Sequence, residues 1–168
     1  MVSSAIRGAS SMSDWSRSQR LTARVARTDI KRLMSTQTVT RAAESDLEPR
    51  EIYDLLAEVS NIPKWAPVFA DHIERIDDTH YNVAKGDESF KLEVMLHQSA
   101  GTVDYVREMP NNKRGGAYIR VTPRPLGGSA ITMTVPIGVN TNELDVGLIV
   151  ERELAELIQV ARTRMSQV

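Results

Sequence analysis

The side chains best suited to acid–base chemistry lie within one segment of the chain, residues 89–109. His97 and Asp104 flank Ala100-Gly101, a pair that we interpret as a two-residue hairpin turn. In that register His97 lies directly opposite Asp104 on the water-facing side of the hairpin, where a cross-strand pair can form. A histidine oriented by a carboxylate can act as a general base, but the sequence favours a solvated structural pair.

The same register directs Tyr105 and Arg107 to the other, apolar face of the hairpin. Leu96 then lies opposite Tyr105, Val94 lies opposite Arg107, and the apolar side chains that share this face are Phe90, Leu92, Val94, Leu96 and Met109. An arginine in such surroundings would suit a ligand carboxylate or enolate, although a surface charge at the strand edge is the simpler interpretation. A three-residue turn would reverse the faces, directing Asp104 inward and Arg107 outward.

Composition and spacing exclude several other kinds of site. The chain has no cysteine, which removes thiol nucleophiles and thiolate metal sites, and His72, His80 and His97 lack metal-ligand spacing. The glycine pairs at 115–116 and 127–128 are not followed by the Lys-Ser/Thr of a phosphate loop. We therefore expect no metal and no cofactor.

Charge and hydropathy limit the partners. The formal net charge of the 168 residues is −1, which argues against a nucleic-acid partner. No apolar run approaches the ~20 residues that a membrane span needs, and no apolar signal-peptide core follows the N-terminus. We expect a cytoplasmic protein without a transmembrane segment, and we leave a homodimer open.

Residues 1–34 differ from the rest of the chain in charge. They hold seven Lys/Arg and two Asp, and the spacing of Arg17, Arg20, Arg24 and Arg27 is helical. An organellar transit peptide or a basic arm for an anionic surface would have this composition. We favour a disordered leader, and Met34 could itself be the true start. The domain is expected over residues 35–168.

The longest periodic segment is residues 140–164, which the sequence predicts to be a helix. Its apolar positions recur at steps of three and four and form one stripe: Leu144, Gly147, Val150, Leu154, Leu157, Ile158 and Ala161. Asn140 and Glu143 resemble a capping pair at its start. Gly147 is unfavourable in a helix interior, which indicates a kink or a close approach to another group.

The segment between residues 37 and 137 predicts a sheet with two small helices near its start. A first strand is expected at 37–44. A helix follows, which begins at Pro49 and has an apolar face made of Ile52, Leu55, Leu56 and Val59. A short turn or second small helix is expected at 61–69. Extended runs then follow at 71–77, 80–85, 89–98, 102–109, 115–123 and 129–137. Six sequential strands joined by short turns indicate an antiparallel meander.

This order of elements resembles the helix-grip fold of the START/Bet v 1-like superfamily, also called SRPBCC, and its polyketide cyclase/dehydrase-like branch. The resemblance rests on residues 47–56 (LEPREIYDLL) and 61–67 (NIPKWAP), which look like the family's opening helix and its Trp-x-Pro corner. It implies an α+β fold in which a curved antiparallel sheet of about seven strands wraps around the C-terminal helix. An apolar cavity would lie between them.

Members of this superfamily bind lipids, sterols, polyketides or hormones, so the resemblance implies binding of a small hydrophobic ligand. The alternatives are a polyketide cyclase or dehydratase that uses His97 and Asp104, and a protein-interaction adaptor. Fold alone does not choose among them. The expected ligand-binding side chains are Trp65, Phe69, Tyr105, Arg107, Tyr118 and Met133, for which plain core packing is the competing interpretation.

Overall fold

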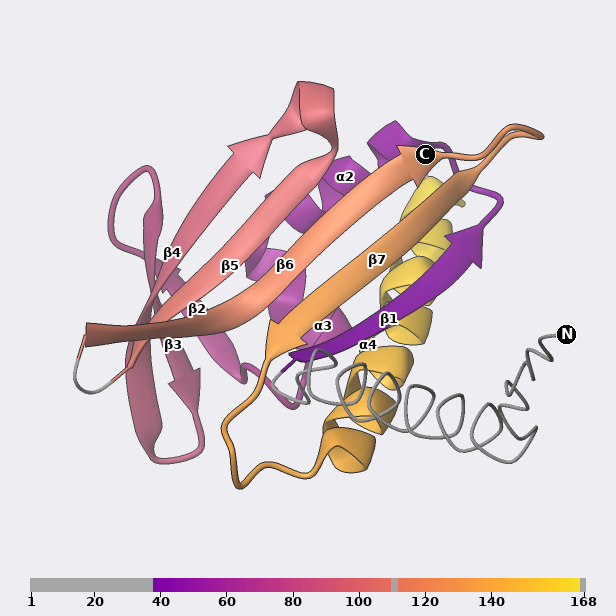
Figure 1. Cartoon of the computed structure of the whole chain (residues 1–168). Coiled ribbons are helices and arrows are strands. Elements are labelled where there is room, and N and C mark those ends of the chain that lie inside the picture. Colours follow the sequence, from indigo (N-terminus) through magenta and orange to yellow (C-terminus); the bar gives the residue numbers. More distant parts are fainter. Residues whose placement is uncertain (1–37, 110–111, 167–168) are drawn as a thin grey trace, which may run out of the picture. The chain divides into compact units, whose positions relative to one another are not determined.

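Seven antiparallel strands form one curved sheet in the computed structural model, which describes residues 38–109 and 112–166 (Figure 1). The strands are β1 (Thr38–Ser45), β2 (His72–Arg75), β3 (His80–Lys85), β4 (Glu88–His97), β5 (Thr102–Met109), β6 (Lys113–Pro123) and β7 (Ser129–Pro136). Their spatial order is β1-β7-β6-β5-β4-β3-β2, so the six later strands form a meander and β1 pairs with the last of them. The predicted meander is confirmed.

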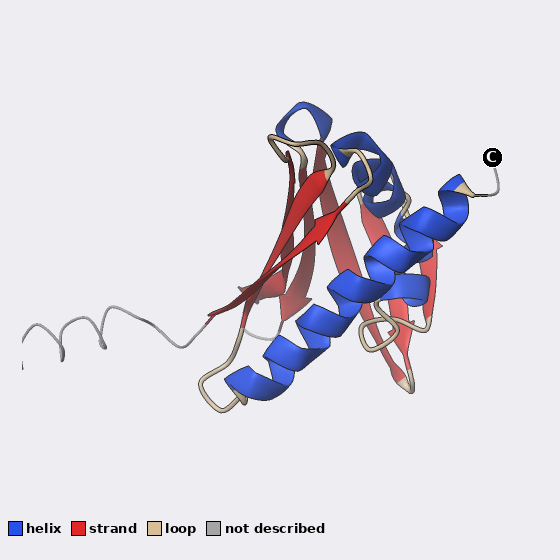
Figure 2. Ribbon diagram, turned by 90° about the vertical axis from the view of Figure 1, so that its right-hand side faces the viewer, coloured by secondary structure: helices blue, strands red, loops and turns tan. Residues whose placement is uncertain are grey.

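The helices are α2 (Pro49–Ala57), α3 (Ile62–Trp65) and α4 (Glu143–Met165), with a short 3-10 turn, η1 (Val59–Asn61), between the first two. Figure 2 shows α4 running diagonally across one face of the sheet. The predicted α+β helix-grip architecture is therefore confirmed. No helix within the described residues is long and apolar enough to cross a bilayer. The predicted leader, residues 1–34, lies outside the described residues.

Helix α2 begins as its sequence predicts. Pro49 occupies the first turn, where a missing backbone N–H costs nothing, and the Glu51 carboxylate accepts a hydrogen bond from the Glu48 backbone N–H at 2.8 Å. Ile52, Leu55 and Leu56 are almost fully buried. Burial of their side chains against the sheet and α4 fixes the position of this helix.

Helix α4 begins later than the sequence predicts. Its N-cap is Asn142, whose Oδ1 accepts a hydrogen bond from the Leu144 backbone N–H at 3.0 Å, so the predicted capping role of Asn140 is wrong. Leu144 is 72% exposed, because it lies in the first turn, before the first buried position of the helix. The rest of the predicted stripe is buried: Gly147, Val150, Leu154, Leu157, Ile158 and Ala161.

Gly147 marks a close approach rather than a kink. The guanidinium of Arg41, from β1, lies against the helix at this position, and a Cβ on residue 147 would be 2.2 Å from Arg41 Nη2. Arg41 Nε donates to Glu151 Oε1 at 2.6 Å, one helical turn further along α4. The absence of a side chain at Gly147 thus leaves room for Arg41, from the edge strand β1, to form an ion pair with Glu151 of the helix.

The predicted register of the β4–β5 hairpin is wrong by two residues. The connection is four residues long, a 3-10 turn η2 (Gln98–Ala100) followed by Gly101 with φ 61°, instead of the two-residue turn Ala100-Gly101. His97 consequently pairs with Thr102, and Asp104 pairs with Met95. Because the displacement is even, each side chain keeps its predicted face, while every predicted cross-strand partner changes.

Candidate functional site

A cavity of about 300 Å³ lies between the sheet and helices α3 and α4. Its wall combines side chains of α3 and the segment after it, of strands β5, β6 and β7, and of the first half of α4. Most are aliphatic or aromatic. Among the described residues, Arg107 from β5 and Glu153 from α4 are the charged side chains in this wall.

The cavity exists partly because β6 contributes little side-chain volume at this point. Gly115, Gly116 and Ala117 follow one another in the strand, and all three line the cavity. Gly116 has φ 151°, and a Cβ there would be 1.9 Å from the Tyr105 carbonyl oxygen, so no larger residue fits. A run of small residues in a strand expected to face the helix was the sequence signal for this space.

Arg107 is held in the cavity wall mainly by an aromatic ring. Its guanidinium carbon is 3.9 Å from the ring centre of Phe90, which packs edge-on against Phe69 with 5.4 Å between ring centroids. Its Nη2 is also 3.9 Å from the exposed carboxylate of Glu88, too far for a strong hydrogen bond. Arg107 Nε is buried and has no hydrogen-bond partner among the described residues. The guanidinium therefore lies in the cavity wall without a strong hydrogen bond to any described side chain.

Tyr105 and Trp65 are neighbouring aromatic residues of the wall, with 6.1 Å between their ring centroids. The Tyr105 hydroxyl donates to the Leu56 carbonyl oxygen of α2 at 2.6 Å, and burial raises the pKa of this phenol. The Tyr105 hydroxyl therefore already donates its proton to a backbone carbonyl and cannot donate it to a ligand. Trp65 Nε1 is buried without a partner among the described residues, so the indole retains a free donor.

Glu153 is a charged residue of the wall that the sequence did not lead us to expect there. It lies three residues after Val150 and seven after Val146, both of which also line the cavity, so it belongs to the inward stripe of α4. Burial raises the pKa of its carboxyl group to about 7, and no cation among the described residues is close enough to oppose this. The sequence signal for this residue was a glutamate at a position that continues the inward-facing stripe of α4.

The structure places five of the six predicted ligand-binding residues in the cavity wall: Trp65, Phe69, Tyr105, Arg107 and Met133. Tyr118 is not in the wall. It lies opposite Asp104 in the β5–β6 register, and its neighbours Ala117 and Ile119 occupy the inward positions of β6. Strand alternation therefore directs Tyr118 to the outer face of the sheet.

The predicted His97–Asp104 pair does not form. His97 is exposed at the end of β4, and Asp104 Oδ1 accepts a hydrogen bond from Arg120 Nη1 at 2.5 Å. Neither residue lines the cavity. The His97–Asp104 general base that the sequence suggested as an alternative therefore does not form, because the longer turn places Asp104 opposite Met95 instead of His97.

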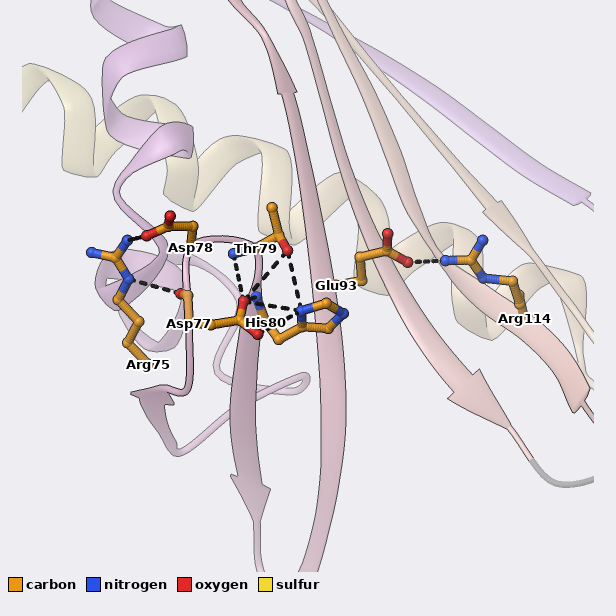
Figure 3. A network of polar contacts seen from close by, with 7 residues as sticks. All are labelled: Arg75, Asp77, Asp78, Thr79, His80, Glu93 and Arg114. Atoms are coloured by element: carbon orange, nitrogen blue, oxygen red, sulfur yellow. Dashed lines mark hydrogen bonds and ion pairs between the residues drawn. The ribbon is translucent and has the colours of Figure 1, made fainter.

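Another histidine, His80, belongs to a polar network around the β2–β3 turn (Figure 3). The Asp77 carboxylate accepts hydrogen bonds from the backbone N–H groups of Thr79 and His80, each at 2.8 Å, and lies 3.0 Å from His80 Nδ1. These donors, the Thr79 backbone N–H first, lower the pKa of Asp77 to about 2. The network closes a turn and contributes nothing to the cavity wall.

Within residues 38–109 and 112–166 no three His, Asp or Glu side chains are grouped so that they could hold an ion.

Comparisons with known proteins identify the fold. No family model matches the sequence, and no curated protein matches it. Solved structures do match. Ara h 8.0201 is 13% identical with a TM-score of 0.53, over 78% of this chain and 98% of that one. A START superfamily protein from Mycobacterium smegmatis is 12% identical with a TM-score of 0.54, over 77% and 97% of the two chains.

A third match is the Zhui aromatase/cyclase from Streptomyces sp. R1128, which is 11% identical with a TM-score of 0.57, over 76% of this chain and 94% of that one. All three matches cover nearly the whole of the other chain. The protein therefore has the helix-grip fold that its sequence predicted, the same fold as these solved structures.

Proposed function

We propose that the protein binds a small, mainly apolar molecule in the cavity between the sheet and α4, with a carbonyl or carboxylate oxygen of the ligand at Arg107. The observation that carries this proposal is an arginine in an apolar cavity wall whose guanidinium has no hydrogen bond to a described residue and lies 3.9 Å from the Glu88 carboxylate. Such a guanidinium can form a charge-assisted hydrogen bond with a ligand oxygen.

The size of the cavity limits the ligand. About 300 Å³ is the volume of roughly ten water molecules in the liquid and lies at the lower end of the range for small-molecule sites. A ligand of roughly ten to fifteen non-hydrogen atoms would fit, such as a medium-chain fatty acid or an alicyclic acid. The largely aliphatic wall favours such a molecule over a stacked planar aromatic one.

An enzyme of the aromatase/cyclase kind is the second candidate, and Glu153 is the observation that favours it. A carboxyl group with a pKa of about 7 can both take and give a proton at neutral pH. The other polar groups of the described wall do not complement it: the Tyr105 hydroxyl is committed to Leu56, and an arginine does not deprotonate. We therefore prefer binding to catalysis.

Isothermal titration with medium-chain and alicyclic acids tests the proposal. We expect Arg107→Met to weaken binding about 10- to 100-fold, since a charge-assisted hydrogen bond contributes about 1.5–3 kcal/mol. Its melting temperature should stay unchanged or rise, because Met fills a similar volume without a charge to bury. His97→Ala, at an exposed position outside the cavity, is the control and should leave both quantities unchanged. Equal affinities of the wild type and Arg107→Met would refute the anchoring role.

A further inference from the structure

Glu153 stands where the cavity meets a second, smaller hollow of about 190 Å³. The residues common to both walls are Trp65, Val68, Ile149 and Glu153. Val68 is 50% exposed and Leu148, in the outer hollow, is 65% exposed. Val68, Ile149 and Glu153 thus lie between the apolar cavity and the solvent, at its mouth, whereas Trp65 is buried.

The Glu153 carboxylate has no hydrogen bond or ion pair to any described side chain, and its neighbours at the mouth are the apolar Trp65, Val68 and Ile149. An exposed glutamate would be hydrated, and a structural one would have a cationic partner. Arg152 and Glu156 also line the outer hollow, but both are exposed. A carboxyl group held half-buried in this way is available to a molecule that enters the cavity.

We propose that Glu153 is a second polar contact of the ligand, which therefore carries a hydroxyl group at the mouth in addition to the carbonyl or carboxylate at Arg107. The ligand class is a small hydrophobic hydroxy acid or hydroxy ketone with an apolar body between its two polar groups. This inference rests on the proposed function, since it assigns the opposite end of the same ligand.

A hydroxyl group suits this position better than an ammonium group. The Glu153 carboxyl is partly protonated near neutral pH, and a hydroxyl can donate to the ionised form and accept from the protonated form. An ammonium group has only donors. It would also have to lose its hydration beside Trp65, Val68 and Ile149, which costs more than desolvating a neutral hydroxyl.

The test uses matched probe pairs at neutral pH: linear acids of about six to twelve carbons and their ω-hydroxy counterparts. Titration calorimetry of the whole chain gives the affinity ratio within each pair. We expect the hydroxy acid to bind about tenfold more tightly at the length that spans Arg107 and Glu153, and equally at shorter lengths. The length of that probe then reports the separation of the two anchors.

Variants assign the preference to one side chain. Glu153→Leu should abolish the hydroxyl preference, so that each plain acid and its hydroxy counterpart bind with equal affinity. Glu153→Gln keeps an acceptor oxygen and should retain part of the preference, whereas Glu156→Leu, one turn further along α4 and outside the cavity wall, should retain all of it. Arg107→Met should weaken both members of every pair equally.

Each other outcome is decisive. Plain acids that bind through Arg107 without a hydroxyl preference at any length overturn this inference and leave the proposed function standing. A preference that persists in Glu153→Leu, or ω-amino acids that bind more tightly than ω-hydroxy acids, also overturns it. Hydroxy acids that require Glu153 but are indifferent to Arg107→Met support it and refute the anchor at Arg107. No binding by any probe overturns both.

Discussion

The half-buried carboxyl of Glu153 should make the stability of this protein depend on pH in a way that one substitution removes. The perturbation is Glu153→Gln, which keeps the size and polarity of the side chain and removes its ionisation. In the folded protein burial raises the pKa of this group from its ordinary value of 4.5 to about 7. In the unfolded chain the group is hydrated and keeps its ordinary value.

The sign follows from the protons bound in each state. Below about pH 4.5 the carboxyl is protonated in both states, and its burial carries no ionic penalty. Between about pH 4.5 and pH 7 the folded protein holds a proton that the unfolded chain has lost, so the free energy of unfolding falls as pH rises. Above about pH 7 both states are ionised, and the full penalty remains. A displacement from 4.5 to about 7 corresponds to about 3 kcal/mol, since each pKa unit is worth about 1.4 kcal/mol.

The assay is urea unfolding of the wild type and Glu153→Gln from about pH 5 to pH 8. The variant should gain on the wild type as pH rises, by about 2 kcal/mol across this range, because only the wild type acquires a buried charge. Groups that titrate identically in both proteins cancel in the difference. Glu156→Gln, at an exposed position one turn away, is the control and should change stability by under about 0.5 kcal/mol at each pH.

A constant difference between Glu153→Gln and the wild type across the pH range would refute the reasoning. It would mean that the carboxyl is hydrated in the folded state or has a cationic partner, and Glu153 would then lose its place as a ligand contact.

Two further predictions concern how α4 is held against the sheet. Gly147→Ala should displace Arg41 from the helix and so break its ion pair with Glu151. Glu151→Gln should therefore cost up to about 1 kcal/mol of stability in the wild type and nothing in the Gly147→Ala background. A double-mutant cycle measured by urea unfolding gives this coupling. Leu154→Ala should lower the free energy of unfolding by about 2–5 kcal/mol, because a buried side chain is lost and a cavity is left. Gln159→Ala, at an exposed position, should lower it by under about 0.5 kcal/mol. Equal losses for the two variants in urea titrations would show that α4 is not packed on the sheet as described.

The sequence predicted the faces of the strands better than their partners. Tyr105 and Arg107 were expected inward because Leu92 and Val94 must be buried, and this alternation depends only on counting along each strand. The partners depend on the length of the turn. Neither Gln98 nor Ser99 is a Gly, Pro, Asn or Asp that would mark the start of a four-residue connection. The turn was therefore predicted to be two residues shorter than it is.

The candidate site could be predicted only in part, for a related reason. Trp65, Phe69 and Met133 were expected in the wall because large apolar residues on inward positions must meet somewhere. Glu153 and the glycines of β6 were missed because apolar periodicity gives no weight to a charged residue in a helix stripe or to small residues in a strand. They follow from the distance between α4 and the sheet, which the sequence does not specify.

The pairing of the first strand with the last has a consequence for how the chain folds. Thr38 pairs with Pro136, and α4, which closes the cavity, follows β7 in the sequence. During synthesis β1 therefore has no partner strand until the whole meander has emerged from the ribosome. Contacts this distant in sequence close slowly, because the loop entropy is lost before the contacts form. The nascent β1 edge is thus exposed to other chains for most of the synthesis time, and rapid self-association of truncated chains that lack β7 and α4 is the expected result.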